Sequence, residues 1–226
     1  MEGTTGLSVV NQLAAFIQGG GVFMFIILGV WGFGIAIALE RFRKLSKTFD
    51  VDGPSFMNEI QRYVLSNDIQ GAIRVCSGSV AALPRVLKSG LKRASQGTEQ
   101  IQNALDATAL EVVPKVESRL NYLQLIANIS TLFGLLGTIQ GLIQSFAAVA
   151  SADAAQKAEL LALGISKAMN TTAFGLISAI TIMVVHQLLS TRAEKIIGDM
   201  EQNSIKLLDL LSTKKGSAPN TDKEAA

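Results

Sequence analysis

The chain of 226 residues contains few of the residues that most catalytic and disulfide-stabilised proteins depend on. It has one cysteine, one histidine and four prolines, and aromatic residues make up 6% of it. The single cysteine, Cys76, excludes an intrachain disulfide, and its neighbours in "RVCSGS" offer no second metal ligand. We interpret it as a small buried residue. The sequence also lacks a glycine-rich phosphate loop, a metal-ligand cluster and a nucleophile constellation, which argues against an enzyme and against a bound cofactor.

Charge is missing from three long stretches. Residues 19–39, 120–152 and 168–191 contain no Asp, Glu, Lys or Arg. Each reaches the ~20 residues that a helix needs to cross a ~30 Å hydrocarbon core. The runs are continuously apolar and do not alternate as barrel strands do. With 49% hydrophobic residues and a mean hydropathy of +0.37, the sequence predicts an all-α membrane protein with three transmembrane helices.

The distribution of basic residues predicts the orientation of these helices. Glu2 is the only charge before the first span, whereas Arg41, Arg43 and Lys44 follow it as a cytoplasmic membrane flank. Residues 40–119 hold twelve Lys or Arg, the chain from Arg192 holds six, and the connection between the second and third spans holds two. The N-terminus is therefore expected outside and the C-terminus inside. The net charge of +2 is small and scattered, which argues against a nucleic-acid partner.

The first apolar run is longer than the core of a signal peptide and has no basic cluster before it, so we expect a retained anchor. The expected segments are a periplasmic N-terminal segment (1–18), a first transmembrane helix (19–39), a cytoplasmic helical domain (40–119), a second transmembrane helix (120–150), a short periplasmic connection (151–166), a third transmembrane helix (167–190), a cytoplasmic helix (191–212) and a disordered tail (213–226). Apolar positions at helical spacing run from Ile101 into the second span, with Pro114 as the only breaker. The second and third spans should therefore extend into the cytoplasm as long helices.

The second span carries polar side chains along one helical face, because their steps of three and four residues keep them on one side. The positions on this face are Asn121, Gln124, Asn128, Thr131, Leu135, Thr138, Leu142 and Ser145. Gly134, Gly137 and Gly141 lie beside it, and the last two form a small-xxx-small pair that lets another helix approach closely.

The third span repeats this arrangement on a smaller scale with Thr171, Gly175 and Ser178. Spacing alone leaves two interpretations open. Small and hydroxyl residues are common wherever membrane helices pack, and their hydrogen bonds contribute ~0.6 kcal/mol on average. The polar face of the second span is, however, longer than one helix crossing requires, which suits a pore. Of the groups that usually relay protons in a membrane, Asp, Glu and His, the spans contain only His186, near one end, so a proton path would need a carboxylate from a partner.

Four segments carry a likeness to a known family: "ANISTLFGLLGTIQGLIQSFAAVA", "LGISKAMNTTAFGLISAI", "LERFRKL" and "PRVLKSGL". With them the chain resembles the MotA/TolQ/ExbB proton-channel family, and its ExbB/TolQ branch most closely, over about residues 20 to 200. The resemblance implies a pentameric funnel of this chain around two copies of an ExbD/TolR-like single-span protein that carries a membrane Asp. A TonB- or TolA-like protein would be a further partner. The family's two pore threonines correspond to Thr138 and Thr172.

The remaining candidate residues fall into two groups. Those expected at the pore or at an interface are Thr171, Asn128, Thr131, Ser145, Gln140, Gln144 and Ser178. Those expected to pack helices together are Gly134, Gly137, Gly141 and Gly175.

The sequence departs from the family pattern at four positions. Thr131 and Thr181 stand where relatives commonly have proline, which should leave straighter helices. Lys167 stands where ExbB-like proteins often have glutamate, so that glutamate's role is not carried over. Gln140 replaces a usual aromatic residue.

The expected function is that of a non-enzymatic channel subunit in the bacterial inner membrane, which couples the proton motive force to mechanical work at the cell envelope. The sequence leaves open which process the channel subunit powers. The alternatives are a TonB-dependent uptake system, a Tol-like system and a gliding or secretion motor. Sodium remains an alternative to protons. The alternative function is a non-conducting helical scaffold that organises partner proteins in the bilayer.

Overall fold

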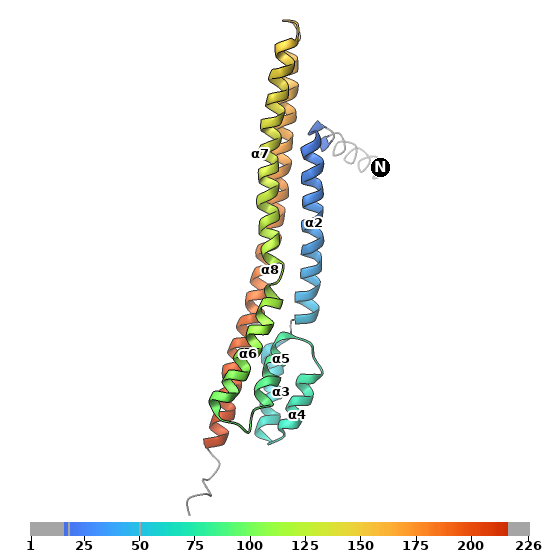
Figure 1. Cartoon of the computed structure of the whole chain (residues 1–226). Helices are drawn as coiled ribbons and strands as arrows, with labels where there is room; N and C mark the ends of the chain where they lie inside the picture. The colour runs from blue at the N-terminus through green and yellow to red at the C-terminus, as the bar shows by residue number, and fades with distance from the viewer. Residues whose placement is uncertain (1–15, 18, 50, 217–226) are drawn as a thin grey trace, which may run out of the picture. The chain divides into compact units, whose positions relative to one another are not determined.

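This computed structural model of the chain describes residues 16–216 except Gln18 and Asp50. Most of the predicted N-terminal segment and the last ten residues of the predicted tail lie outside the described residues. The described part is helical and contains no strand. Its elements are α2 (Val22–Lys44), a π-helix η1 (Leu45–Phe49), α3 (Gly53–Leu65), α4 (Ile69–Ser77), α5 (Ala82–Leu91), α6 (Thr98–Glu117), α7 (Leu120–Ser151) and α8 (Lys157–Gly216) (Figure 1).

Three helical stretches are long and apolar enough to cross a membrane. They are Val22–Lys44, Thr98–Ser151 and Lys157–Lys214, with mean hydropathies of 2.5, 1.5 and 1.8. At most 28% of each apolar window is buried within the chain, so most of this surface requires lipid or other protein chains as its surroundings. The predicted fold class, an all-α membrane protein with three membrane helices, is confirmed. The predicted boundaries of the membrane segments on these helices stay predictions.

The chain divides into two compact units. One, the membrane unit, comprises residues 1–40 and 119–188, and the other, the small-helix unit, comprises residues 41–118 and 189–226. In the membrane unit, α7 and the first part of α8 run antiparallel (Figure 1). Helix α2 packs against both, because a methyl group on Gly34 would lie 2.8 Å from Ile182 Cδ1 and 3.0 Å from Ile126 Cγ2.

The small-helix unit is built from short amphipathic helices. Helix α5 buries seven of its ten residues and packs closely on α6, where Leu105 leaves no room for a side chain at Gly90. The Ser89 hydroxyl donates to the Ala104 carbonyl across the same contact at 2.9 Å. Lysine 214 of α8 donates to the Asn67 Oδ1 atom at 2.9 Å and so joins α8 to the turn between α3 and α4.

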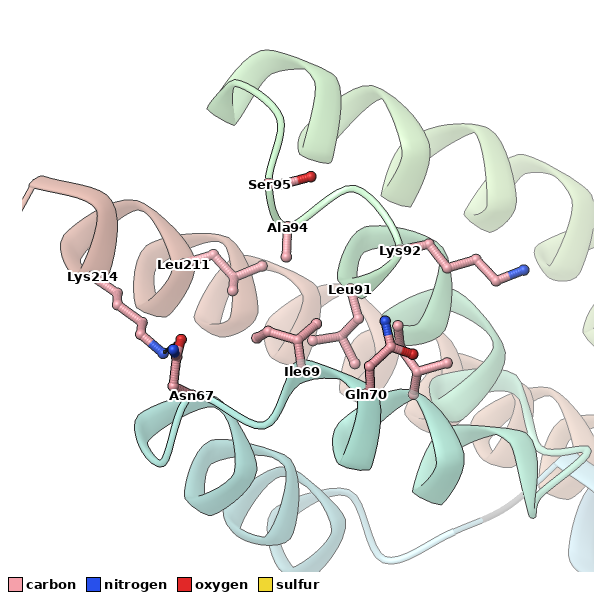
Figure 2. Close-up of a pocket in the computed structure, with 10 residues that line it drawn as sticks. Asn67, Ile69, Gln70, Leu91, Lys92, Ala94, Ser95, Leu211 and Lys214 are labelled. Atoms are coloured by element: carbon pink, nitrogen blue, oxygen red, sulfur yellow. Dashed lines mark hydrogen bonds between the residues drawn. The ribbon is translucent and has the colours of Figure 1, made fainter. Parts of the chain in front are cut away.

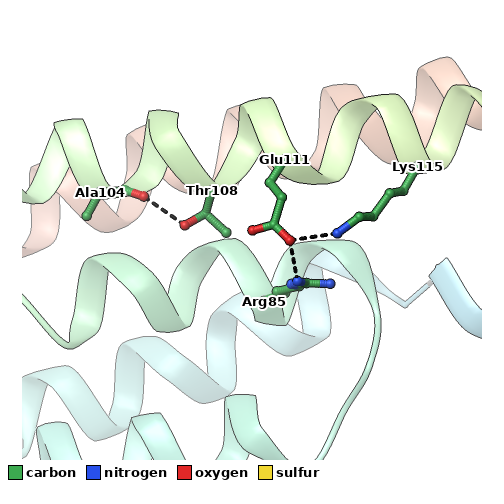
Figure 3. A network of polar contacts seen from close by, with 5 residues as sticks. All are labelled: Arg85, Ala104, Thr108, Glu111 and Lys115. Atoms are coloured by element: carbon green, nitrogen blue, oxygen red, sulfur yellow. Dashed lines mark hydrogen bonds and ion pairs between the residues drawn. The ribbon is translucent and has the colours of Figure 1, made fainter.

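An exposed ion-pair network also joins α5 to α6 (Figure 3). The Glu111 carboxylate accepts from Lys115 at 2.6 Å and from Arg85 at 2.7 Å. The hydrogen bond from Lys115 and the charge of Arg85 lower the pKa of Glu111 below its ordinary value. Because all three side chains are about half exposed, solvent screens this network, and the buried contact of α5 with α6 is the stronger constraint.

The junction between α6 and α7 corrects one prediction. The helix continues through Pro114 but ends at Glu117, and Arg119 takes a left-handed conformation with φ of 64° before α7 begins. The interruption therefore lies at residues 118–119 and not at Pro114. Proline removes one backbone hydrogen bond but is tolerated in a helix whose packing compensates, whereas a left-handed residue ends the helical path outright.

The buried Arg41 guanidinium satisfies the end of α6. It donates to the carbonyls of Lys115 and Val116 and to the Ser118 hydroxyl at 3.0 Å, and it is 1% exposed. The last carbonyls of a helix have no partner within the helix, so a guanidinium at this position supplies the donors that they need. The sequence assigned Arg41 only to the basic membrane flank and did not predict this contact.

Replacing Arg41 tests this capping contact. The substitution Arg41→Met should lower the free energy of unfolding by about 2–4 kcal/mol, because it leaves buried carbonyls without donors. Arg43→Met is the matched control, since Arg43 is exposed two residues further along the same helix. Chemical unfolding in detergent measures both. Equal effects of the two substitutions would contradict the proposed role of Arg41.

The buried thiol of Cys76 gives a second test. It is 1% exposed, and burial raises its pKa to about 12, so that almost no thiolate exists at neutral pH. We expect a maleimide reagent to leave Cys76 unmodified in the folded protein between pH 7 and pH 9 and to modify it after denaturation. The double variant Cys76→Ala, Ser77→Cys moves the thiol to the adjacent exposed position and should react quickly and faster as the pH rises. Rapid labelling of the wild-type protein would show that Cys76 is accessible.

Candidate functional site

The two threonines singled out from the sequence meet in the membrane unit. Thr138 on α7 and Thr172 on α8 are 34 residues apart in sequence, and their hydroxyl oxygens lie 3.3 Å apart. Antiparallel packing of the two helices brings them to this one point. Both side chains are half-buried, so the pair borders the surface of the unit.

The hydrogen bonds of this threonine pair leave oxygen lone pairs free. Thr138 donates to the Leu135 carbonyl at 2.6 Å, and Thr172 donates to the Gly134 carbonyl of the other helix at 2.7 Å. A hydroxyl has one proton and two lone pairs. With the protons directed at carbonyls, the pair can accept a hydrogen bond from a protonated acid or a hydrated proton. It can donate to an ionised carboxylate only after one hydroxyl rotates.

A row of small residues lets α7 and α8 come this close. At each level a small residue of one helix faces a small residue of the other. The facing pairs are Ser145 with Gly164, Gly141 with Ala168, Gly137 with Thr171, and Gly134 with Gly175. We call this row the small-residue seam. Its closest contact with backbone atoms is at Gly175, where a methyl group would lie 2.8 Å from the Ser130 carbonyl oxygen and 2.9 Å from Gly134 Cα. The sequence did not single out Gly164, because it falls in the predicted connection 151–166, whereas in the structure it lies on α8 and forms a small-xxx-small pair with Ala168.

Three of the other candidate residues face the interior of the membrane unit. The Thr171 hydroxyl is buried and donates to the Gly20 carbonyl at 2.9 Å, which ties α8 to the residues before α2. The buried Ser145 hydroxyl donates to the Gly141 carbonyl at 2.7 Å within the seam. The Ser178 hydroxyl is also buried and has no hydrogen-bond partner among the described residues.

The remaining polar residues of α7 lie on exposed surface. Asn128 accepts a hydrogen bond of 3.3 Å from Gln124, and Thr131 donates to the Ala127 carbonyl at 3.2 Å. Gln140 and Gln144 are exposed and line a cleft beside Lys167. The predicted polar face is therefore divided in the structure, because the glycines beside it, and not the polar residues themselves, form the closest contact with α8.

The two positions where the sequence departs from a family proline are uninterrupted helix. Helices α7 and α8 continue through Thr131 and Thr181. The Thr181 hydroxyl donates to the Ile177 carbonyl at 2.7 Å, one turn earlier in the same helix. A proline at either position would instead remove a backbone donor and bend the helix.

The small-helix unit contains a cleft of about 460 Å³ with an apolar floor (Figure 2). Ile69, Leu91 and Leu211 form part of this floor, while Lys92 and Lys214 lie at its edge. The ammonium of Lys214 is already bonded to Asn67 and to the Val64 carbonyl, so it supports the turn around Asn67. No group of three or more His, Cys, Asp or Glu side chains that could hold a metal ion occurs in the described part of the chain.

These features define an all-α membrane protein in which a tightly packed antiparallel helix pair places two hydroxyls side by side. The chain belongs to the MotA/TolQ/ExbB proton channel family, whose family model matches residues 79–202. The predicted resemblance is thereby confirmed. The family is one of channels and not of enzymes.

Individual relatives include proteins named ExbB and a protein named TolQ. The chain is 24% identical over 185 residues to the ExbB homolog of Methanothermobacter thermautotrophicus. This match covers 81% of this chain and 65% of that protein. It is 43% identical over 84 residues to the biopolymer transport protein exbB1 of Vibrio cholerae, 37% of each chain. It is 32% identical over 100 residues to the Tol-Pal system protein TolQ of Pseudomonas aeruginosa, 44% of this chain and 43% of TolQ. The matched stretches span less than two thirds of these relatives' own lengths.

A solved structure shows the same fold. A chain of the C. jejuni MotAB structure superposes with a TM-score of 0.61 at 15% identity, over 92% of this chain and 84% of the other.

The seam can be tested by adding one methyl group. Gly175→Ala should lower the free energy of unfolding by roughly 1–3 kcal/mol, because the methyl would contact backbone atoms of α7 that cannot move aside easily. Gly198→Ala lies in the same helix where nothing is within 4 Å, and it should be neutral or stabilising through helix propensity. Thermal unfolding of both variants in detergent measures the difference. Equal stability of the two would exclude a close contact at Gly175.

Proposed function

We propose that this chain is the channel-forming subunit of an inner-membrane machine that uses the proton motive force for mechanical work at the cell envelope. The observation that carries the proposal is the pair of hydroxyls, Thr138 and Thr172, 3.3 Å apart within two charge-free runs of the sequence. Membership of the proton channel family supports it. The neighbours named for biopolymer transport and for the Tol-Pal system support work at the envelope, and their names do not choose between the two systems.

The pair needs a carboxylate from another chain. The three charge-free runs hold no acidic side chain, and a proton relay in the membrane requires a group that gains and loses a proton. We propose that a single-span partner of the ExbD/TolR type supplies an Asp beside the threonine pair. When that Asp is protonated, a threonine lone pair accepts its hydrogen bond. When the Asp is ionised, a rotated threonine hydroxyl donates to it. Each proton that crosses a membrane potential of 100 mV releases ~2.3 kcal/mol, which is available for mechanical work.

Exposed apolar surface supports an oligomer around such a partner. Large apolar residues of α7 that are more than 40% exposed in the single chain lie on the faces away from the seam. Within residues 130–151 they are Leu132, Leu135, Leu136, Ile139, Ile143 and Phe146. We propose that some of these contact neighbouring copies in a pentamer and that others face lipid, with the threonine pair towards the central partner.

We propose that the chain lies in the membrane with its N-terminus periplasmic and its C-terminus cytoplasmic. The exposed Arg43 at the end of α2 and the twelve basic residues in 40–119 support this orientation, because positively charged segments stay in the cytoplasm. In this orientation the short connection between α7 and α8 is periplasmic. The small-helix unit is then cytoplasmic.

The second candidate function, a non-conducting scaffold, is favoured by one observation. Both threonine hydroxyls already donate to carbonyls within the chain, as packing residues do. A scaffold predicts that reconstitution with the single-span partner leaves the proton permeability of liposomes unchanged. A channel predicts partner-dependent flux that an Asp-to-Asn change in the partner abolishes.

Removing each hydroxyl separately tests the proposed ion path. Thr172→Val and Thr138→Val should each reduce proton flux into liposomes by roughly tenfold, the effect of losing one hydrogen bond of about 1.4 kcal/mol in the rate-limiting step. Flux is followed with an entrapped pH-sensitive dye after co-reconstitution with the partner.

Thr181→Val is the matched control, because its hydroxyl bonds only to its own helix. It should keep full flux. Wild-type flux in both variants of the pair, with the complex assembled, would refute the assignment. Repeating the measurement without sodium and with the pH gradient retained distinguishes protons from sodium ions, and we expect the flux to persist.

A further inference from the structure

A cleft that contains three polar side chains opens in the membrane unit beside the start of α2. It has a volume of about 410 Å³ and lies where the segment 20–23 meets α7 and α8. Its polar side chains come from two helices, Gln140 and Gln144 from α7 and Lys167 from α8. Gly137 and Gly141 of the seam form part of its wall. None of the residues that line it is acidic.

The polar groups of this cleft have no partners in the described part of the chain. Lys167 makes no ion pair there, and the side-chain amides of Gln140 and Gln144 make no hydrogen bonds to described residues. The ammonium and the two amides lie exposed on this surface, so their N–H groups can donate to an occupant. The cleft therefore presents one positive charge and several N–H donors to an occupant.

The backbone next to Lys167 is shaped around its side chain. Gly21 has φ of +71°, which favours glycine, and a methyl group there would lie 2.8 Å from Lys167 Cε and 3.2 Å from Lys167 Nζ. The aliphatic part of Lys167 thus lies across Gly21, and its ammonium is at the wall of the cleft. Glycine at position 21 adopts this left-handed conformation without steric cost and leaves the space that the end of the Lys167 side chain occupies.

The cleft lies at the edge of the hydrocarbon core. The charge-free run 168–191 begins directly after Lys167 and is about 36 Å long at ~1.5 Å per residue, enough to cross a ~30 Å core. Lys167 therefore lies at the level where lysine ammonium groups reach the headgroups. Gln144 lies about 10 Å along α7 from Ser151, where that helix ends.

An anion with several acceptor oxygens fits this donor set. A phosphodiester accepts from an ammonium and from amide N–H groups at once, and its bonds to the ammonium are charge-assisted. The volume equals that of about a dozen waters at ~30 Å³ each, so a partly hydrated phosphate fits. Val22, at the cleft, and Phe25, on the next turn of α2, are exposed apolar side chains that could contact an acyl chain.

We propose that this cleft binds the phosphate group of an anionic phospholipid in the leaflet at the α7–α8 connection. Lys167 supplies the charge, and Gln140 and Gln144 supply hydrogen bonds. The proposal concerns a lipid site and does not require the threonine pair to conduct ions.

Native mass spectrometry tests the proposal by counting the lipids that each chain retains. The full-length protein is released from nanodiscs of phosphatidylcholine in which about one lipid in five is phosphatidylglycerol. Lys167→Gln should lower retention of phosphatidylglycerol about tenfold, the effect of one charge-assisted hydrogen bond. Lys167→Arg should retain the lipid, and Gln140→Leu with Gln144→Leu should lower retention less than Lys167→Gln.

Lys157→Gln is the matched control, because Lys157 begins the same helix on the same side of the membrane and does not line the cleft. It should leave retention unchanged. The proposal would be overturned if Lys167→Gln retained as much phosphatidylglycerol as the wild type, or if Lys157→Gln lost as much as Lys167→Gln. Retention of phosphatidylcholine to the same extent as phosphatidylglycerol would also overturn it.

Two further arms identify the source of the anion. Inorganic phosphate added to the detergent-solubilised protein should not displace the lipid, and displacement at millimolar concentration would assign the cleft to free phosphate instead. Carbodiimide cross-linking of Lys167 to an acidic side chain of another protein chain, with no lipid retained, would assign it to a protein partner and overturn the lipid site.

Discussion

The close approach of α7 and α8 along the small-residue seam is the constraint on which the rest of the membrane unit depends. In lipid there is no hydrophobic gain from bringing two apolar helices together, so association relies on van der Waals contact and short polar contacts. Glycine at positions 134, 137 and 141 lets the backbones come close enough for both. The hydrogen bond from Thr172 to the Gly134 carbonyl exists because no side chain at that glycine intervenes.

The same seam decides what the polar residues of α7 can do. Because the glycine stripe faces α8, Thr138 lies at the margin of the contact, where it reaches Thr172 and still borders the surface. Ser145 lies within the contact and is buried. Asn128 and Thr131 are left outside it. One helical face in the sequence thus serves helix packing, a hydroxyl pair and exposed surface, and helix geometry alone assigns each residue to its place.

Features that depend on local pattern could be predicted from the sequence. The charge-free runs predict the membrane class, and the pairing of "GLLGT" with "NTTAFGL" indicated the two threonines that the fold brings together. Features that depend on contacts between distant segments could not. Arg41 meets the end of α6 some 75 residues away, and nothing in "LERFRKL" distinguishes it from its basic neighbours. The left-handed conformation of Arg119 could not be predicted either, because the position is not occupied by glycine or asparagine, the residues that usually adopt it.

Lys167 links the cleft to the threonine pair through electrostatics. It precedes Thr172 by five residues, about 7.5 Å along the helix axis. The charge of this exposed ammonium repels a second cation at the pair, and solvent weakens the repulsion. ExbB-like relatives often have glutamate at this position, which would act in the opposite direction. A phosphate bound in the cleft would offset the charge of Lys167 without changing either threonine, so occupancy of the cleft would alter the electrostatic environment of the threonine pair.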